Sequence, residues 1–456
     1  MIRQVVDRRE MHRYVEALRE QLGAPELQDA AARAANTFDG QGDPVAQLRA
    51  ALPPVAPGLA SSGGRKTAQV PFMSRDPIQS LMQSTLEGKL RERGVPGEAP
   101  EHRGPLGWLI HLIESILHPV RFGPDDPNWV IDVAGSVLDR LALGNHPFNP
   151  TPAEYEIAEN ARVVIVGDWG TGLPRARKVA EHMAEEVSGA LAEGREAHVI
   201  HLGDVYYSGL EREVNHHVLA PGMWPVTSAQ AGEGVTSWSL NGNHDMYGGG
   251  YGYFKTLLGD ERFAKQTADG KPTSYFRLRS PSWDIVGLDT AWDPDVLSLG
   301  MVGVLEDPQA AYVERVAGES ERKLMLLSHH QLVSVYDTED LGPTLPAKLA
   351  PVLKDGRVTA WLWGHEHRLM GFQSAGGVKI PRCIGHGGVP VLMTHTPEES
   401  IPAPGLWQET AFSKYHGDHW GRMGFAVLDF AGLQIEVRYR DEQGTTSRTE
   451  TFPLSQ

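Results

Sequence analysis

The sequence predicts a layered α/β fold preceded by a mostly helical amino-terminal region. From Ala161 onward, short runs rich in β-branched residues alternate with helical or loop segments. Before about residue 155, apolar residues instead recur at intervals of three and four, which is the helical period. Near the carboxyl terminus, two apolar runs flank Ala431 and Gly432, which predicts a hairpin. We therefore divide the chain into residues 1–155 and residues 156–456.

The first region contains helical segments separated by proline and glycine clusters, which are typical of loops and linkers. These segments carry no chemistry that we can name. We expect residues 1–155 to form a helical region of unknown role, which could recruit a protein partner or regulate access to a site in the second region. The predicted helices are residues 11–22, 27–37, 77–93, 106–119 and 129–143.

The second region contains short apolar runs that lack the strict alternation of half-exposed strands. Strands of this kind are buried on both faces, as in a layered fold. A further strand is expected at residues 447–452, after a hairpin formed by residues 425–430 and 433–439. The other predicted strands are residues 162–166, 198–202, 236–240, 274–278, 284–288, 323–327 and 359–363.

Composition and charge exclude several classes of function. The 456 residues carry a net charge of -16 without a dense block of Lys and Arg, so we expect no nucleic-acid partner. The single cysteine, Cys383, excludes a disulfide within the chain and a cysteine-rich zinc site. The first ten residues lack the apolar core of a signal peptide, and the apolar stretch at residues 106–117 is too short to span a bilayer. We expect a cytoplasmic protein that does not enter a membrane.

Five of the predicted strands end directly in residues that can bind a metal ion. Because ligands gather beyond the carboxyl ends of strands in open α/β sheets, the five clusters can converge on one place. In four of them a glycine precedes the first candidate ligand and keeps the backbone compact where the chain turns toward an ion. The clusters are Gly167-Asp168, Gly203-Asp204, Gly242-Asn243-His244-Asp245, Ser328-His329-His330 and Gly364-His365-Glu366-His367.

Each cluster alone has a simpler explanation. An Asp after a strand is most often a turn or a helix cap, and Asn-His-Asp in a glycine-rich loop is commonly a turn. Five such clusters in this order, each at a strand end, favour a metal site over these separate explanations.

The order Gly-Asp, Gly-Asp, Gly-Asn-His-Asp, His and Gly-His-x-His resembles the calcineurin-like metallophosphoesterases. Most members of that superfamily have a histidine two residues after the first Asp, where this chain has Gly170. The purple acid phosphatases lack that histidine and use a tyrosine three residues after the second Asp, where this chain has Tyr207. The chain therefore resembles the purple acid phosphatase branch. That resemblance implies a β-sandwich core flanked by helices and a metal-dependent phosphoric ester hydrolase.

The resemblance also implies a set of ligands for two metal ions. Carboxylate and amide oxygens suit hard cations, imidazole suits zinc, manganese and iron, and a bridging carboxylate allows two ions to lie close together. One ion would take Asp168, Asp204, Tyr207 and His367, and the other would take Asn243, His329 and His365 and share Asp204 as the bridge.

Two neighbouring residues compete for places in this set. Tyr206 is disfavoured because the spacing of the family selects Tyr207 and because adjacent residues in an extended chain point in opposite directions. His329 is favoured over His330 because the ligand of the family is usually the first histidine after the strand. His330 would then orient a ligand or a substrate oxygen.

Charge favours iron(III) at the Tyr207 site, with iron(II), zinc or manganese at the other. A free phenol has a pKa of about 10, so a strongly acidic ion is the natural cause of its ionisation. Two carboxylates, one phenolate and a bridging hydroxide would leave such an ion pair with a small positive charge, which suits a phosphate ester anion.

The expected reaction is hydrolysis of a small phosphate monoester by a metal-bound hydroxide. His244 resembles the catalytic histidine of the family and would protonate the leaving oxygen or hold the phosphate, with Asp245 orienting it. A phosphodiesterase acting on cyclic nucleotides or small diesters would share the same metal core. A catalytically silent interaction scaffold is the alternative from another class, although such a protein should show gaps in the ligand set.

Overall fold

The computed structural model describes residue 140 and residues 144–453, except residues 207, 294–302, 336–343, 390, 392–400, 402 and 416–417. The helices predicted in residues 11–119 lie outside the described residues, and so does Tyr207. Of the helix predicted at residues 129–143 only Arg140 is described, and it is helical.

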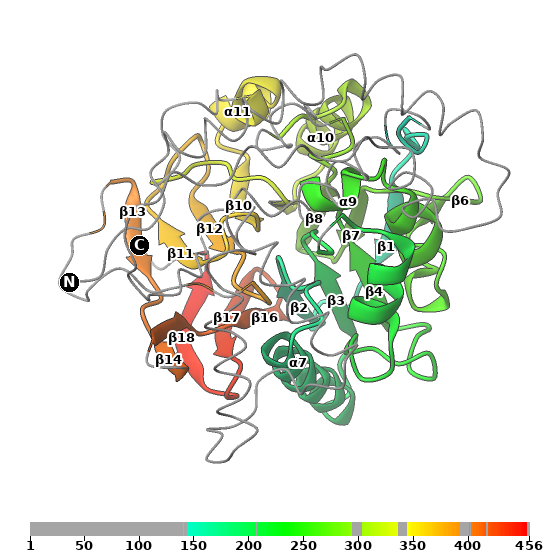
Figure 1. The fold of residues 1–456 in the computed structure, drawn as a ribbon. Helices are drawn as coiled ribbons and strands as arrows, with labels where there is room; N and C mark the ends of the chain where they lie inside the picture. Colours follow the sequence, from blue (N-terminus) through cyan, green and yellow to red (C-terminus); the bar gives the residue numbers. More distant parts are fainter. Residues whose placement is uncertain are drawn as a thin grey trace, which may run out of the picture.

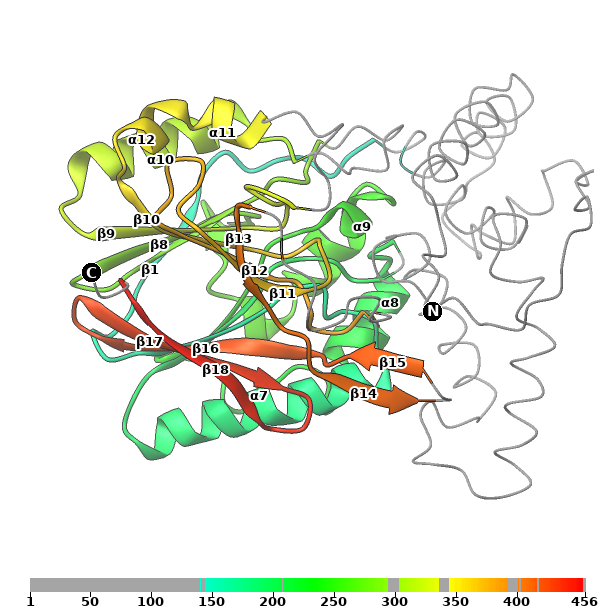
Figure 2. The same ribbon diagram turned by 90° about the vertical axis from the view of Figure 1, so that its left-hand side faces the viewer.

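Two β-sheets stacked face to face form the centre of the molecule (Figures 1 and 2). The six-stranded sheet has the order β18-β17-β16-β2-β3-β4, in which β2, β3 and β4 run parallel and the last three strands of the chain are antiparallel. Its strands are β2 (Arg162–Val166), β3 (Ala197–His201), β4 (Val235–Ser239), β16 (Gly424–Ala431), β17 (Gln434–Asp441) and β18 (Thr446–Phe452).

The second sheet has eight strands in the order β1-β7-β8-β9-β10-β12-β11-β13. Its central strands β8, β9, β10 and β12 run parallel. The strands are β1 (Ala153–Glu156), β7 (Phe276–Arg279), β8 (Trp283–Leu288), β9 (Lys323–Ser328), β10 (Val358–Trp363), β11 (Leu369–Phe372), β12 (Ile380–Ile384) and β13 (Gly405–Gln408). Two small hairpins complete the strands: β5 (Thr267–Ala268) with β6 (Lys271–Pro272), and β14 (Phe412–Tyr415) with β15 (Asp418–Gly421).

Helices cover the outer face of each sheet and give the fold four layers (Figure 2). One apolar cluster lies between the sheets and joins residues such as Ile165 of β2 to Leu327 of β9. A second packs α7 (Pro174–Ala192) on the six-stranded sheet, and a third packs α10 (Asp307–Glu319) and α12 (Ala350–Lys354) on the eight-stranded sheet. The shorter helical elements are α8 (Glu211–Val214), α9 (Asn243–Met246), α11 (Thr344–Lys348), the π-helical turns at Asn215–Leu219 and Gly252–Leu257, and a 3-10 turn at Glu261–Phe263.

The predicted fold class is confirmed: a layered α/β structure with a β-sandwich core flanked by helices. Each predicted strand is present within two residues of its expected bounds, and β16 and β17 form the expected hairpin. Strand β1 spans the boundary that we placed after residue 155 and pairs with β7 in the larger sheet. No helix among the described residues has the length and apolar character needed to cross a membrane.

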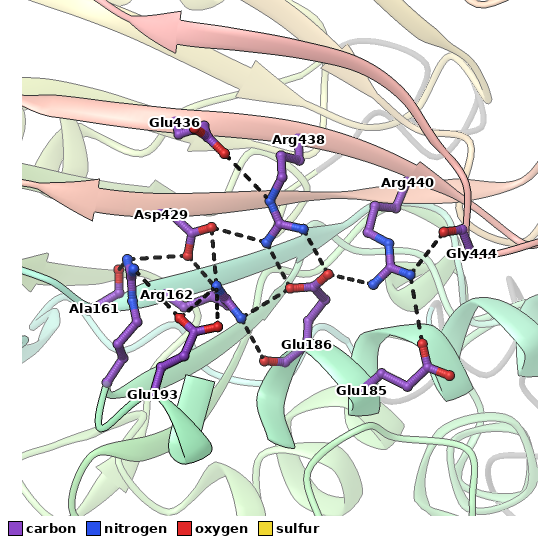
Figure 3. Close-up of polar contacts among 11 residues, drawn as sticks. Ala161, Arg162, Glu185, Glu186, Glu193, Asp429, Glu436, Arg438, Arg440 and Gly444 are labelled. Atoms are coloured by element: carbon purple, nitrogen blue, oxygen red, sulfur yellow. Dashed lines mark hydrogen bonds and ion pairs between the residues drawn. The ribbon is translucent and has the colours of Figure 1, made fainter. Parts of the chain in front are cut away.

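A network of ion pairs around the buried side chains of Glu186 and Arg162 joins α7 to the six-stranded sheet (Figure 3). The Glu186 carboxylate on α7 accepts hydrogen bonds from Arg438 at 2.8 and 2.9 Å and also pairs with Arg440. Arg162 of β2 lies 3.2 Å from the same carboxylate and donates to Asp429 of β16 at 2.6 Å. Burial alone would raise the pKa of Glu186, but Arg438 and Arg440 outweigh it and lower that pKa below its usual value.

Replacing Glu186 by glutamine should lower the free energy of unfolding by about 2 kcal/mol, because it removes the carboxylate that Arg162, Arg438 and Arg440 share and leaves their charge only partly balanced by the remaining acidic side chains. The pKa of Glu186 is lower in the folded protein than in the unfolded chain. The Glu186 carboxylate therefore stabilises the fold at pH values above its unfolded-state pKa, and this stabilisation is lost as the pH falls through its folded-state pKa. Urea denaturation should therefore show a large difference between wild type and variant at neutral pH and a smaller one below about pH 4.

The matched control is Glu185→Gln, one residue earlier on the same helix. Its side chain is 60% exposed and lies 3.7 Å from Arg440, so its loss should change stability by less than about 1 kcal/mol. Equal effects of the two variants would contradict a stabilising role for the network around Glu186.

Candidate metal centre

The five predicted clusters meet at one end of the two stacked sheets. Strands β2, β3 and β4 supply Asp168, Asp204 and Asn243 from the six-stranded sheet, whereas β9 and β10 supply the histidines from the eight-stranded sheet. The site thus lies at the edges of both sheets. The sequence predicts all five clusters at the edge of a single open sheet, which accounts for only part of the site. The predicted ligands within the described residues are all buried: Asp168, Asp204, Asn243, His329, His365 and His367.

The first group of donors consists of Asp168, Asp204 and His367. One ligand atom from each lies within 4.8 Å of the others. The Tyr206 hydroxyl lies among them, 3.1 Å from Asp168 Oδ1, 3.0 Å from Asp204 Oδ2 and 2.8 Å from His367 Nε2. Among the described residues, which do not include Tyr207, the phenol that borders this group is that of Tyr206, which the sequence disfavours as a ligand.

The second group contains Asn243, His329 and His365. His329 Nε2 lies 3.0 Å from Asn243 Oδ1 and 3.2 Å from His365 Nδ1. His330 is next to this group, and the ligand atoms of the three histidines lie within 4.8 Å of one another. The structure thus brings both adjacent histidines to the site, and His329 contacts Asn243.

Asp204 joins the two groups. Its Oδ2 faces Tyr206, and its Oδ1 lies 3.4 Å from His329 Nε2 and accepts a hydrogen bond of 3.1 Å from the backbone amide of His244. A carboxylate that directs one oxygen to each group has the placement required of a bridging ligand.

The candidate ligands are held in unusual backbone conformations. Left-handed φ angles occur at Asp168 (54°), Asp204 (75°), His365 (67°) and His367 (48°). The remaining non-glycine residue with such an angle in the described chain is Asp269, in the exposed β5–β6 hairpin. Such strain is common at functional sites, where the surrounding structure enforces it.

Two of the glycines before the ligands are required by close packing. A Cβ on Gly242 would lie 2.0 Å from Asp204 Oδ1, and one on Gly364 would lie 2.6 Å from Asp168 Oδ2. These backbone segments therefore touch the carboxylates directly, which explains why glycine precedes the ligands.

Asp245 connects two of the ligand loops. Its carboxylate accepts hydrogen bonds from the backbone amides of Gly242 at 2.7 Å, Asp204 at 2.9 Å and Val205 at 3.1 Å. These hydrogen bonds fix the loop that carries Asp204 against the loop that carries Asn243. The expectation that Asp245 also orients His244 stays a prediction.

The ring of His244 lies between two tyrosine rings. Its centroid is 4.5 Å from that of Tyr206 and 4.8 Å from that of Tyr247, and its Nε2 lies 3.9 Å from Asp204 Oδ2. The predicted catalytic histidine is therefore at the bridging carboxylate.

Two residues that the sequence argument missed support the predicted ones. Tyr247 accepts a hydrogen bond of 2.9 Å from Asn243 Nδ2, which turns Asn243 Oδ1 toward His329. Thr290 Oγ1 accepts from the His330 amide at 3.2 Å and lies 2.9 Å from His330 Nδ1. Two features of the sequence could have indicated them: Tyr247 follows Asn243 by four residues, the helical spacing, and Thr290 lies just after β8.

The donor chemistry fits metal ions. The carbonyl of Leu202 can only accept, so the 3.1 Å contact to His329 Nδ1 places the proton there and leaves a lone pair on His329 Nε2. That lone pair faces Asn243 Oδ1 at 3.0 Å and Asp204 Oδ1 at 3.4 Å. Three acceptor atoms directed at one another are stabilised by a cation between them.

The electrostatics agree with this interpretation. Burial, reinforced by neighbouring imidazoles, lowers the pKa of His329 and of His365 well below the usual value, so both rings are neutral and able to bind a metal. Burial and the charge of Asp204 raise the pKa of Asp168, against the opposing effect of His367. Within the part of the chain that the structure describes, only histidines pair with these two carboxylates. A buried site with two carboxylates and neutral imidazoles lacks positive charge, which metal ions supply.

Comparisons with known proteins find similarity to phosphoesterases. The sequence model of the family "Calcineurin-like phosphoesterase" matches residues 161–369. Tartrate-resistant acid phosphatase type 5 of Oryctolagus cuniculus is 27% identical over 304 residues, which cover 62% of this chain and 88% of that protein. The Homo sapiens protein of the same name is 26% identical, with 68% of this chain and 93% of that protein covered. A solved dimetal phosphatase from Danio rerio is 14% identical with a TM-score of 0.42, over 67% of this chain and all of that one.

These findings confirm the resemblance predicted from the sequence, which is to the calcineurin-like metallophosphoesterases and, within them, to the purple acid phosphatase-like branch. The family match and the two donor groups together support a dimetal phosphoesterase, and so a hydrolase of phosphoric esters.

Proposed function

We propose that this protein hydrolyses small phosphate monoesters at a two-metal centre. The observation that carries the proposal is the pair of donor groups, Asp168 with His367 and Asn243 with His329 and His365, joined by the two oxygens of Asp204. Tartrate-resistant acid phosphatases match 62% to 68% of the chain, which favours a monoester over a diester as substrate.

Each ion would have its own protein donors apart from the shared Asp204. Asp168, Asp204 and His367 would hold one ion, for which we propose iron(III) because a phenol borders this group. Asn243, His329 and His365 would hold iron(II), zinc or manganese, with Asp204 shared. Bound ions of this kind neutralise charge on the phosphoryl oxygens and lower the pKa of water. The predicted role of Tyr207 as a ligand remains a prediction.

The protein residues position the substrate and move a proton. His244 lies at the bridging carboxylate, and the rings of Tyr206 and Tyr247 restrict its orientation. From this place its imidazole would donate a proton to the leaving oxygen of the ester. His330, fixed by Thr290, would orient His365 or a substrate oxygen, since the two imidazole rings lie 4.8 Å apart.

Metal removal and reloading test the proposed function. Protein treated with a chelator should lose hydrolysis of para-nitrophenyl phosphate and regain it on reloading with iron, zinc or manganese, and metal analysis should give about two ions per chain. The monoester should be hydrolysed faster than bis(para-nitrophenyl) phosphate. Faster hydrolysis of the diester would indicate a phosphodiesterase instead. Fewer than about one bound ion, with no hydrolysis under any metal, would indicate an interaction scaffold.

A further inference from the structure

We propose that Tyr206, and not the adjacent Tyr207, is the tyrosine ligand of the ion bound by Asp168, Asp204 and His367. This inference rests on the proposed two-metal centre. It assigns the phenolate to the second residue after the bridging carboxylate, one position earlier than the family spacing implies.

The surroundings of the Tyr206 oxygen are those of a ligand atom. Three potential ligand atoms lie within 3.1 Å of it, Asp168 Oδ1, Asp204 Oδ2 and His367 Nε2. The hydroxyl has one proton and can donate it to only one of them. An ionised carboxylate can only accept a hydrogen bond. The two carboxylate oxygens and the phenol oxygen therefore share a single proton, and lone pairs of these atoms face one another without a proton between them. A cation in place of the phenol proton would let all these atoms act as donors to one centre.

The backbone before Tyr206 is fixed by Gly170. The Tyr206 amide donates to Gly170 O at 3.0 Å, and the Gly170 amide donates to Asp204 O at 3.3 Å. A Cβ on residue 170 would lie 2.7 Å from Asp204 O and 2.8 Å from Val205 Cα. The absence of a side chain at Gly170, where most relatives in the superfamily would have a histidine, therefore allows the close approach of the segment that carries Tyr206.

The other side of Tyr206 is also held in place. The Tyr206 carbonyl accepts a hydrogen bond of 2.8 Å from His217 Nδ1, and the ring packs 4.5 Å from that of His244. The side chain is completely buried. A phenol fixed by its ring, carbonyl and amide is preorganised to present its oxygen to one ion, and a hard, anionic oxygen suits iron(III).

The test compares Tyr206→Phe with its neighbour Tyr207→Phe in the full-length protein loaded with iron(III). A phenolate bound to iron(III) gives a visible charge-transfer band. We expect Tyr206→Phe to lose this band and Tyr207→Phe to keep it. Phenylalanine retains the ring that packs on His244, and circular dichroism of both variants would verify the fold. Gallium(III) provides a second readout, because ionisation of a phenol on binding changes the near-ultraviolet spectrum without any redox chemistry.

The outcomes separate this inference from the proposed function. The ligand assignment to Tyr206 would be wrong if Tyr207→Phe lost both the iron(III) charge-transfer band and the gallium(III) near-ultraviolet change while Tyr206→Phe kept them. It would also be wrong if the wild-type protein showed neither the band nor the change. Hydrolysis of the monoester by wild type is measured independently. A metal-dependent hydrolase whose band depends on Tyr207 would refute the ligand assignment alone, whereas a Tyr206-dependent band without hydrolysis would refute the proposed function alone.

Discussion

Replacing Asp204 by asparagine should lower kcat/KM for a phosphate monoester by about 10³-fold or more. A bound ion supplies several kcal/mol of transition-state stabilisation, and each 1.36 kcal/mol is about a factor of ten in rate. Asp204 faces both donor groups, with Oδ2 at 3.0 Å from the Tyr206 hydroxyl and Oδ1 at 3.4 Å from His329 Nε2. Asparagine removes the negative charge that the two ions would share, so metal analysis should show less than two ions per chain.

Asparagine is chosen because the variant should still fold. The φ angle of Asp204 is 75°, and asparagine is among the few residues that readily adopt the left-handed region. Asp269→Asn is the matched control, since Asp269 has a φ of 53° in an exposed hairpin and touches no predicted ligand. It should keep the metal content and activity of wild type. Retention of both ions and full activity in Asp204→Asn would contradict the bridging role.

The sequence could predict the strands and their polar ends because both follow from local pattern. Short apolar runs must be buried on both faces, and the first polar residues after them must lie at the sheet edge. Strand β1 could not be found in this way, because its sequence Ala-Glu-Tyr-Glu has no apolar run and of its four residues only Ala153 is buried. Strand β12 was difficult for another reason. Arg382 interrupts its apolar pattern and is nevertheless completely buried, held by Glu450 at 2.8 and 2.9 Å.

Spacing and pattern alone cannot decide between adjacent residues in the loops. The alternation of side chains in an extended chain disfavours Tyr206 as a ligand. That alternation does not apply after Asp204, whose φ of 75° turns the chain out of the extended region. The direction of Tyr206 is set by its contacts to Gly170 and His217, neither of which a spacing rule includes. The sequence of a strand also does not indicate which of the two stacked sheets the strand joins, so this part of the topology could not be predicted.

Replacing His244 by alanine should lower kcat/KM by about 10²- to 10⁴-fold for an alkyl phosphate, because general acid catalysis contributes effects of this size. The effect should be much smaller for an aryl phosphate whose leaving group needs no proton. The placement of His244 suits this role, because its ring packs near those of Tyr206 and Tyr247 and its Nε2 lies 3.9 Å from Asp204 Oδ2. Steady-state kinetics with the two substrates would measure the ratio of the losses.

That ratio distinguishes the two roles proposed for His244. A histidine that only holds the phosphate would contribute equally to both substrates, and the variant would mainly raise KM. The control is His216→Ala, because His216 is exposed on the short helical segment after α8, and its loss should leave both rates near those of wild type. An equal loss for the alkyl and aryl substrates would assign phosphate binding to His244. The proton for the leaving oxygen would then have to come from another residue at the site, such as His330, whose ring lies 4.8 Å from that of His365.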